Sequence, residues 1–270
     1  MSCSERAGSV THSSQVRTQP TPGAGSLLSL VIPAYDEEPN VEACYRELVA
    51  VLGDLGRPFE VIFVDDGSTD GTFAVLSRLA ATDGRVRAIR FRRNAGQTAA
   101  LAAGFRAARG EIVVTMDADL QNDPRDIPKL LAALPGCDAV CGWRVDRQDP
   151  WTKRVGSRVA NAVRRYFTRD GVHDTGCMLK AFRREALVQL PLHRGMHRFL
   201  PALLRMEGYR LVEVPVRHRP RRAGRSKYGN WSRLWAGLAD LWAVRWMARR
   251  RLDYEIVEER GGVPAPGGPR

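Results

Sequence analysis

The chain of 270 residues lacks several patterns that define common classes of protein. It has no run of roughly 18 or more apolar residues, so the sequence predicts no transmembrane span. Residues 1–26 contain no apolar stretch suited to the core of a signal peptide, and their content of Ser, Thr, Gly and Pro predicts a disordered tail. The glycines are not spaced as in the dinucleotide-binding fingerprint or the P-loop, so neither of these nucleotide sites is expected.

Cysteine is also scarce. The five cysteines are odd in number and scattered, and no His-rich segment accompanies them to suggest a zinc site. Cys137 and Cys141 bracket the apolar pair Ala139-Val140, and we interpret them as small buried hydrophobic residues. This cysteine usage fits a reducing compartment.

Acidic residues are few towards the carboxyl terminus. The formal net charge is +12, which implies an anionic partner such as nucleic acid, an anionic membrane or a phosphorylated substrate. Residues 217–251 contain eleven lysines and arginines and one acid, Asp240, so the excess charge is regional. The basic run 217–227 has no aromatic residues between its charges, and we therefore expect no nucleic-acid partner.

Short apolar runs alternate with segments of helical spacing along most of the chain. Buried strands are expected at 27–32, 59–64, 110–116 and 137–142, a strand with one wet face at 86–91, and an edge strand at 209–216. Helices are expected at 40–52, from about 70 to 81, and at 94–108, 125–134 and 150–168. This order predicts an α/β fold with a mostly parallel central sheet flanked by helices, in one main domain over residues 27–230.

The strand expected at 110–116 turns abruptly acidic where it ends. If the chain stays extended, Asp117, Asp119 and Gln121 project from one face, because alternate residues share a side. Hard oxygen ligands of this kind suit Mg²⁺ or Mn²⁺. The alternative is that these acids form a solvated turn or cap the next helix, which begins at Asp123-Pro124.

Four of the expected strands end in polar groups suited to a nucleotide. Ligands of open α/β sheets bind beyond the carboxyl ends of the strands, so these groups are expected to meet at one edge. Asp65 or Asp66 is placed to accept hydrogen bonds from a base or ribose, Tyr35 to stack, and Asp117 with Asp119 to hold the metal. The four strand ends read Tyr35-Asp36-Glu37, Asp65-Asp66, Asp117-x-Asp119 and Trp143-Arg144.

The same segments resemble family-2 inverting glycosyltransferases of the GT-A fold, over roughly residues 27–231. The similarity rests on Val31-Ile32-Pro33-Ala34-Tyr35-Asp36-Glu37, Val64-Asp65-Asp66-Gly67-Ser68-Thr69-Asp70, Asn94-x-Gly96 and Met116-Asp117-Ala118-Asp119-Leu120-Gln121. Asp174-Thr175-Gly176-Cys177 and Gly224-Arg225-Ser226-Lys227-Tyr228-Gly229 are similar to the branch typified by dolichyl-phosphate mannose synthase and bacterial polyprenyl-phosphate sugar transferases.

The resemblance implies a nucleoside-diphosphate sugar donor such as GDP-mannose or a UDP-hexose, a divalent metal, and a polyprenyl or dolichyl phosphate acceptor. It assigns the donor nucleotide to Pro33, Tyr35, Glu37, Asp65, Asp66, Asn94 and Asp117, and the metal to Asp117, Asp119 and Gln121. Arg144 stands where the family has an arginine that meets phosphate. Asp36 departs from the asparagine usual in the family, and unlike asparagine it cannot donate a hydrogen bond.

A phosphate monoester acceptor is already nucleophilic near neutral pH, since its second pKa is roughly 6. The acceptor site then needs positive charge, for which the candidates are Arg144, Arg154, Arg158, Arg219 and Lys227. Asp119, Asp174 and Arg144 are the candidate catalytic residues, with Asp174 as the base or as a carboxylate that orients the acceptor. His173 is a further possible metal ligand, although a lone histidine is more often a surface or core residue.

The carboxyl-terminal part has helical spacing of Trp and Leu over residues 231–251, followed by a charged and then Gly/Pro-rich tail at 252–270. The expected amphipathic helix fits a peripheral position on the cytoplasmic face of an anionic membrane, or packing on its own domain or a membrane-protein partner. Two alternatives to the leading function stay open: a glycosyltransferase with a soluble or polymeric hydroxyl acceptor, in which a base is needed, and a basic binding protein without activity.

Overall fold

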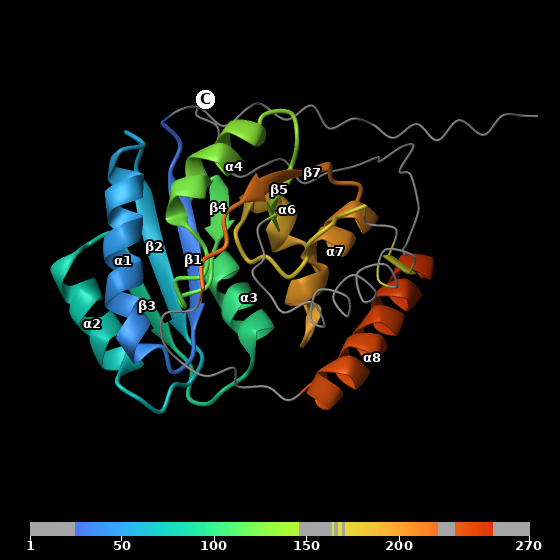
Figure 1. Cartoon of the computed structure of the whole chain (residues 1–270), viewed down its shortest axis with the longest axis horizontal. Helices are drawn as coiled ribbons and strands as arrows, with labels where there is room; N and C mark the ends of the chain where they lie inside the picture. The colour runs from blue at the N-terminus through green and yellow to red at the C-terminus, as the bar shows by residue number, and fades with distance from the viewer. Residues whose placement is uncertain (1–24, 146–163, 165–166, 169–170, 221–229, 251–270) are drawn as a thin grey trace, which may run out of the picture.

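The computed structural model describes residues 25–145, 164, 167–168, 171–220 and 230–250. Its strands form one seven-stranded sheet in the order β3-β2-β1-β4-β6-β5-β7 (Figure 1). The strands are β1 Leu28–Ala34, β2 Phe59–Asp65, β3 Val86–Arg90, β4 Ile112–Thr115, β5 Ala139–Arg144, β6 Lys180–Arg183 and β7 Leu211–Val216. The helices are α1 Glu38–Gly53, α2 Thr72–Thr82, α3 Gln97–Ala107, η1 Pro124–Asp126, α4 Ile127–Ala133, α6 Arg184–Val188, η2 Met196–Phe199, α7 Leu200–Met206 and α8 Asn230–Arg249.

The predicted mostly parallel sheet is confirmed. The pairs β1–β2, β1–β4, β2–β3 and β5–β7 are parallel, and β6 alone runs antiparallel, between β4 and β5. The sequence analysis missed β6, because a four-residue strand that includes Lys180 and Arg183 has no apolar run to mark it. The predicted edge position of residues 209–216 is confirmed, since β7 ends the sheet and pairs with β5 alone.

The side chains of β1 divide between two hydrophobic clusters, one on each face of the sheet. Leu28, Leu30 and Ile32 pack in the first cluster with α1, α2 and α4, whereas Val31 packs in the second cluster with α3, α6 and α7. This division follows from the period of two in an extended strand. The result is three layers with the sheet in the middle, and burial of these apolar side chains is the main stabilising contribution.

Helix α8 joins the second layer. Figure 1 shows it beside α7, on the side of the molecule away from α1 and α2. Leu241 and Val244 are buried in the second cluster, while Trp242 is 70% and Trp246 is 51% exposed. Among the described side chains, Leu241 and Val244 thus pack on the domain, whereas Trp242 and Trp246 face away from it.

Several sequence-based assignments lie outside the described residues. These are the disordered tail before residue 25, most of the helix expected at 150–168, the basic run at 221–229, and the tail after residue 250.

Candidate active site

The carboxyl ends of four strands meet at one edge of the sheet. The chain passes from β1 through β2 to β3 on one side and then returns to place β4 on the other side of β1. Strand β5 runs in the same direction as β4, because both are antiparallel to β6. The carboxyl ends of β1 and β4 thus lie at a topological switch point, which is where open α/β sheets bind ligands.

Pro33 follows the last paired residue of β1 on the β4 side. The register pairs Val31 with Thr115, and the Met116 amide donates to the Val31 carbonyl at 3.4 Å. The next ladder bond on this side would need an N–H at Pro33, which proline lacks. Pairing between β1 and β4 therefore ends, whereas the β1–β2 pair continues to Ala34, whose carbonyl accepts from the Asp66 amide at 2.8 Å.

The residues after β4 leave the sheet in a turn. The prediction that Asp117, Asp119 and Gln121 continue an extended strand is wrong, because residues 118–120 form a turn in which Leu120 has φ +62°. The Asp119 carboxylate accepts from the Gln121 amide at 3.1 Å, a local bond that competes with the extended conformation. The start of the next helix at Asp123-Pro124 is confirmed, since the Asp123 side chain accepts from the Arg125 amide.

Asp117, directly before this turn, and Asp119 within it form a carboxylate pair. Burial and then the charge of Asp119 raise the pKa of Asp117 to about 7, while Lys180 and Arg144 act in the opposite direction. Gln97, the first residue of α3, donates to Asp117 from Nε2 at 2.8 Å. Two crowded carboxylates in a low-dielectric site favour the binding of a proton or a cation.

A divalent cation fits this donor set only with ligands from elsewhere. Within the described residues no group of three or more His, Cys, Asp and Glu side chains is arranged to hold a metal. Mg²⁺ typically uses one or two protein carboxylates, with water and substrate phosphates completing the coordination. Asp117 and Asp119 match the carboxylate part of that pattern.

The raised pKa of Asp117 predicts how the metal-free protein responds to pH. The unfolded carboxyl titrates near ~4, so as pH rises towards about 7 the folded state keeps a proton that the unfolded state has lost. The free energy of unfolding contributed by this group therefore falls across that window. Chemical denaturation in chelator at several pH values should show this loss, and the Asp117→Asn variant should lack it. An unchanged pH slope in the variant would show that Asp117 is not the group responsible.

The residues after β1 are tied to the residues after β2. Asp36 has φ +48°, and its carboxylate accepts from the Thr69 amide at 2.8 Å. Its own amide donates to Ser68 Oγ, and the Glu37 amide donates to Thr72 Oγ1. Asp36 thus functions as a hydrogen-bond acceptor within the protein, a role that aspartate fills as well as the asparagine usual in the family.

Asp66 and Asn94 likewise bond to each other and to the backbone. The Asp66 carboxylate accepts from the Ala95 and Gly96 amides at 2.7 and 2.9 Å and from Asn94 Nδ2 at 3.1 Å. Burial nevertheless raises the pKa of Asp66. Asp66 therefore fixes the conformation of the loop before α3.

Asp65 is fully buried at the end of β2. Its Oδ1 accepts from the Ser68 amide at 3.0 Å. Its Oδ2 has no hydrogen bond, although Arg90 Nε lies 3.4 Å away. A buried acceptor with unused capacity is suited to a donor from a bound molecule.

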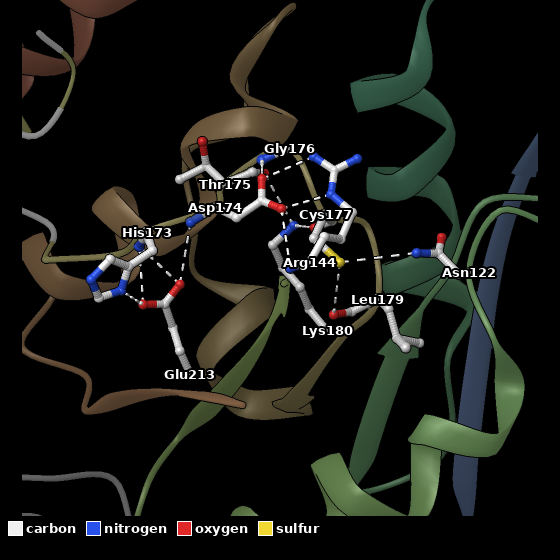
Figure 2. Close-up of polar contacts among 10 residues, drawn as sticks. All are labelled: Asn122, Arg144, His173, Asp174, Thr175, Gly176, Cys177, Leu179, Lys180 and Glu213. Carbon is white, nitrogen blue, oxygen red and sulfur yellow. Dashed lines mark hydrogen bonds and ion pairs between the residues drawn. The ribbon is translucent and has the colours of Figure 1, made fainter. Parts of the chain in front are cut away.

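Arg144, the last residue of β5, is held by Asp174 (Figure 2). Arg144 Nε donates to Asp174 Oδ2 at 2.6 Å and Nη2 donates to Oδ1 at 2.9 Å, a bidentate pair. Burial lowers the pKa of Arg144, but the hydrogen bond and charge of Asp174 outweigh it and raise the pKa. The Gly176 amide also donates to Asp174 Oδ1, so in this structure the Asp174 carboxylate orients Arg144.

The sequence analysis missed two residues that fix the loop at 173–177. Glu213, on the edge strand β7, accepts from the amides of His173 and Asp174 and contacts His173 Nδ1 at 2.8 Å. Lys180 is fully buried, and its Nζ donates to the carbonyls of Thr175 and Cys177. Figure 2 shows these two side chains approaching the loop from different elements. Glu213 could have been recognised in the sequence as a charged residue inside the strand predicted at 209–216.

The remaining candidates are placed differently. The His173 ring stacks on Trp143 at 4.8 Å and contacts Glu213, an arrangement typical of a structural histidine. Arg219, a candidate for acceptor phosphate, forms ion pairs with Glu47 and Asp123. Arg154, Arg158 and Lys227 lie outside the described residues.

Together the parallel sheet, its switch point and the acidic turn define an α/β fold of the GT-A type. Residues 29–190 match the model of the glycosyl transferase family 2, and the chain belongs to this family. The chain is 40% identical over 206 residues to an undecaprenyl-phosphate 4-deoxy-4-formamido-L-arabinose transferase of Edwardsiella ictaluri, a match covering 75% of this chain and 63% of that protein.

Two further proteins are similar. A dodecaprenyl-phosphate galacturonate synthase of Rhizobium johnstonii is 38% identical over 228 residues, covering 82% of this chain and 67% of that protein. Glucosyl-3-phosphoglycerate synthase of Mycobacterium tuberculosis, solved with Mn²⁺, UDP and glucosyl-3-phosphoglycerate, has a TM-score of 0.62 at 23% identity, covering 84% of this chain and 80% of that one. The Edwardsiella relative has additional length, since the chain matches 63% of it.

Proposed function

We propose that this chain is an inverting glycosyltransferase that moves one sugar from a nucleoside-diphosphate sugar to a polyprenyl phosphate. The observation that carries the proposal is the position of the Asp117–Asp119 pair and the oriented Arg144 at the same edge of the sheet. Family membership supplies the reaction class, and the names of the Edwardsiella and Rhizobium relatives supply the acceptor class.

The proposed donor site is at the carboxyl ends of β1 and β4. Tyr35 and Glu37 lie on the β1 side, and Asp65 offers its unused carboxylate oxygen to the base or ribose. Asp117 and Asp119 would hold Mg²⁺ or Mn²⁺ against the diphosphate. When bound, the metal stabilises the negative charge that develops on the leaving nucleotide.

On the acceptor side, positive charge binds and orients the acceptor phosphate. Asp174 accepts from Nε and Nη2 of Arg144, whereas Arg144 Nη1 makes no hydrogen bond to the described residues. In the proposal, Nη1 binds a phosphate oxygen of the acceptor. The phosphate oxygen attacks the anomeric carbon as the bond from that carbon to the nucleotide diphosphate breaks. No proton needs to be removed from a phosphate dianion, so a general base is unnecessary.

The hydroxyl-acceptor alternative fits less well. A hydroxyl needs a base, and Asp174 is the candidate carboxylate on the acceptor side. Its oxygens already accept from Arg144 and the Gly176 amide, so both are engaged in orienting Arg144 and the loop rather than left to a hydroxyl. This hydrogen-bonding pattern supports the phosphate acceptor.

A donor screen followed by a transfer assay tests the proposed function. The thermal unfolding of the full chain is measured with UDP- and GDP-sugars, with Mn²⁺ or with chelator, and the stabilising donor is then incubated with a short polyprenyl phosphate. We expect one donor class to raise the Tm only with Mn²⁺, and a sugar–phosphate–lipid product to form. No Tm change with any donor, or transfer to a soluble hydroxyl alone, counts against the proposal.

The finer proposal for location is the cytoplasmic face of an anionic membrane. None of the helices that the structure describes combines the length and the apolar character needed to cross a bilayer. Helix α8 does expose Trp242 and Trp246, with the Arg250 guanidinium 5.9 Å from the Trp246 ring, a pairing suited to an anionic interface. Flotation with anionic vesicles should be lost in a Trp242→Ala/Trp246→Ala variant and kept in Val188→Ala, a change at an exposed hydrophobic residue on α6.

A further inference from the structure

The segment that follows β7 lies against the acidic turn after β4, within residues 117–123. The Arg219 amide donates to the Gln121 carbonyl at 2.9 Å, and Asn122 and His218 form an isolated antiparallel bridge. Residues 218–219 thus extend alongside 121–122, although about a hundred positions separate them in the sequence. This contact joins the edge of the sheet to the turn that contains Asp119.

The Arg219 side chain adds a second connection. Its Nη2 lies 2.7 Å from Asp123 Oδ1, and its Nη1 lies 2.5 Å from Glu47 Oε2 on α1. The Asp123 side chain is 5% exposed. A phosphate at this guanidinium would have to displace a carboxylate from a short contact, so the geometry disfavours substrate binding by Arg219.

The acidic turn needs support of this kind. Leu120 is in the left-handed region at φ +62°, a conformation that costs a non-glycine residue free energy and persists where the surroundings enforce it. Pairing between β1 and β4 has already ended at this point because of Pro33. Within the turn the Asp119 carboxylate accepts from the Gln121 amide at 3.1 Å, and the Asp117 amide reaches Asn122 Oδ1 only at 3.4 Å. Contacts from outside the turn must therefore contribute to its shape.

We propose that Arg219 is a positioning residue that braces the turn containing Asp117 and Asp119, its side chain acting through Asp123 and its backbone amide through Gln121. Its role is to hold the two carboxylates in the arrangement that a cation and a diphosphate require. The effect on nucleotide binding rests on the proposed function, whereas the effect on the turn does not. Glu47 is part of the same brace, because it fixes the other end of the guanidinium to α1.

The test compares Arg219→Gln with Glu47→Gln, and with Arg217→Gln as the matched control. Arg217 is in the same segment and has the same charge, but its side chain is 68% exposed and lies 3.7 Å from Asp123. Hydrogen–deuterium exchange of residues 117–123 is measured on the full metal-free chain. The dissociation constant of UDP or GDP, whichever the unaltered protein binds, is measured with Mn²⁺ and without acceptor.

We expect the amides of residues 117–123 to exchange faster in Arg219→Gln and Glu47→Gln than in the unaltered protein. In Arg217→Gln their exchange rate should not change. Nucleotide binding should weaken by roughly tenfold in the first two variants, as is common when the partners of metal ligands are removed. Arg219→Lys should recover part of the loss. If exchange and nucleotide affinity are unchanged and only the KM for polyprenyl phosphate rises, Arg219 is an acceptor ligand and the proposal is overturned.

The two proposals fail in different ways. An unaltered protein that binds neither nucleotide overturns the proposed function, while exchange of residues 117–123 still decides whether Arg219 braces the turn. Unchanged exchange in both Arg219→Gln and Glu47→Gln overturns the brace, even if nucleotide binding and transfer proceed as proposed.

Discussion

Replacement of Asp119 by alanine should lower the rate of sugar transfer by roughly a thousandfold, equivalent to about 4 kcal/mol of barrier height. Asp119 is one of the two carboxylates proposed to hold the cation, and it is 5% exposed. Without it, one protein ligand to the cation is lost, and the charge on the departing diphosphate is poorly stabilised. The rate is measured with saturating donor and excess Mn²⁺, so that a simple loss of metal affinity is partly compensated.

The control for this variant is Asp54→Ala, which removes an exposed carboxylate after α1. It should retain full activity. Circular dichroism and Tm confirm that the Asp119→Ala protein is folded. A folded Asp119→Ala protein with more than a tenth of normal activity would mean that the reaction does not depend on this carboxylate.

Replacement of Arg144 by lysine should lower kcat/KM for the polyprenyl phosphate by about a hundredfold. The guanidinium bonds to both oxygens of Asp174 and still has Nη1 for a further donor contact, and an ammonium group cannot reproduce this geometry. The donor dissociation constant should change little. Arg92→Lys, which alters an exposed arginine, is the matched control and should behave as the unaltered protein.

The Asp174→Asn variant separates two interpretations of the same pair. Asparagine keeps one acceptor oxygen for Arg144, so an orienting role predicts a loss of about tenfold. A general base predicts a loss of roughly 10²–10⁴-fold and a changed pH profile. A loss in that higher range, with Arg144 still ordered, would favour the hydroxyl-acceptor mechanism over the one proposed.

The main features of the fold follow from patterns in the sequence. The buried runs that became β1, β2, β4 and β5 are marked by apolar residues, and the polar residues that follow each run mark its carboxyl end. Parallel pairing then brings these ends together, which is a property of the topology and needs no knowledge of side-chain contacts. The edge strand was predicted from the alternation over 209–216 and from Pro215, and the middle of β7 is only partly buried.

The parts that could not be predicted depend on contacts between distant residues. Strand β6 is recognisable only from its pairing with β4 and β5, since Lys180 breaks the apolar pattern. The turn at Asp119 depends on the missing N–H of Pro33, some 85 positions earlier, and on Arg219, a hundred positions later. Likewise, a basic residue that looks available for phosphate in the sequence can already be paired, as Arg219 is with Glu47.

Calorimetric titration of the donor's nucleotide is the most direct test of the account. The unaltered protein and the Asp117→Ala/Asp119→Ala variant are each titrated with UDP and with GDP, in Mn²⁺ and in chelator. The account predicts binding of one nucleotide by the unaltered protein in Mn²⁺, and at least tenfold weaker binding in chelator and in the variant. Equal affinity in all four conditions would contradict the claim that these two carboxylates hold a cation against the diphosphate.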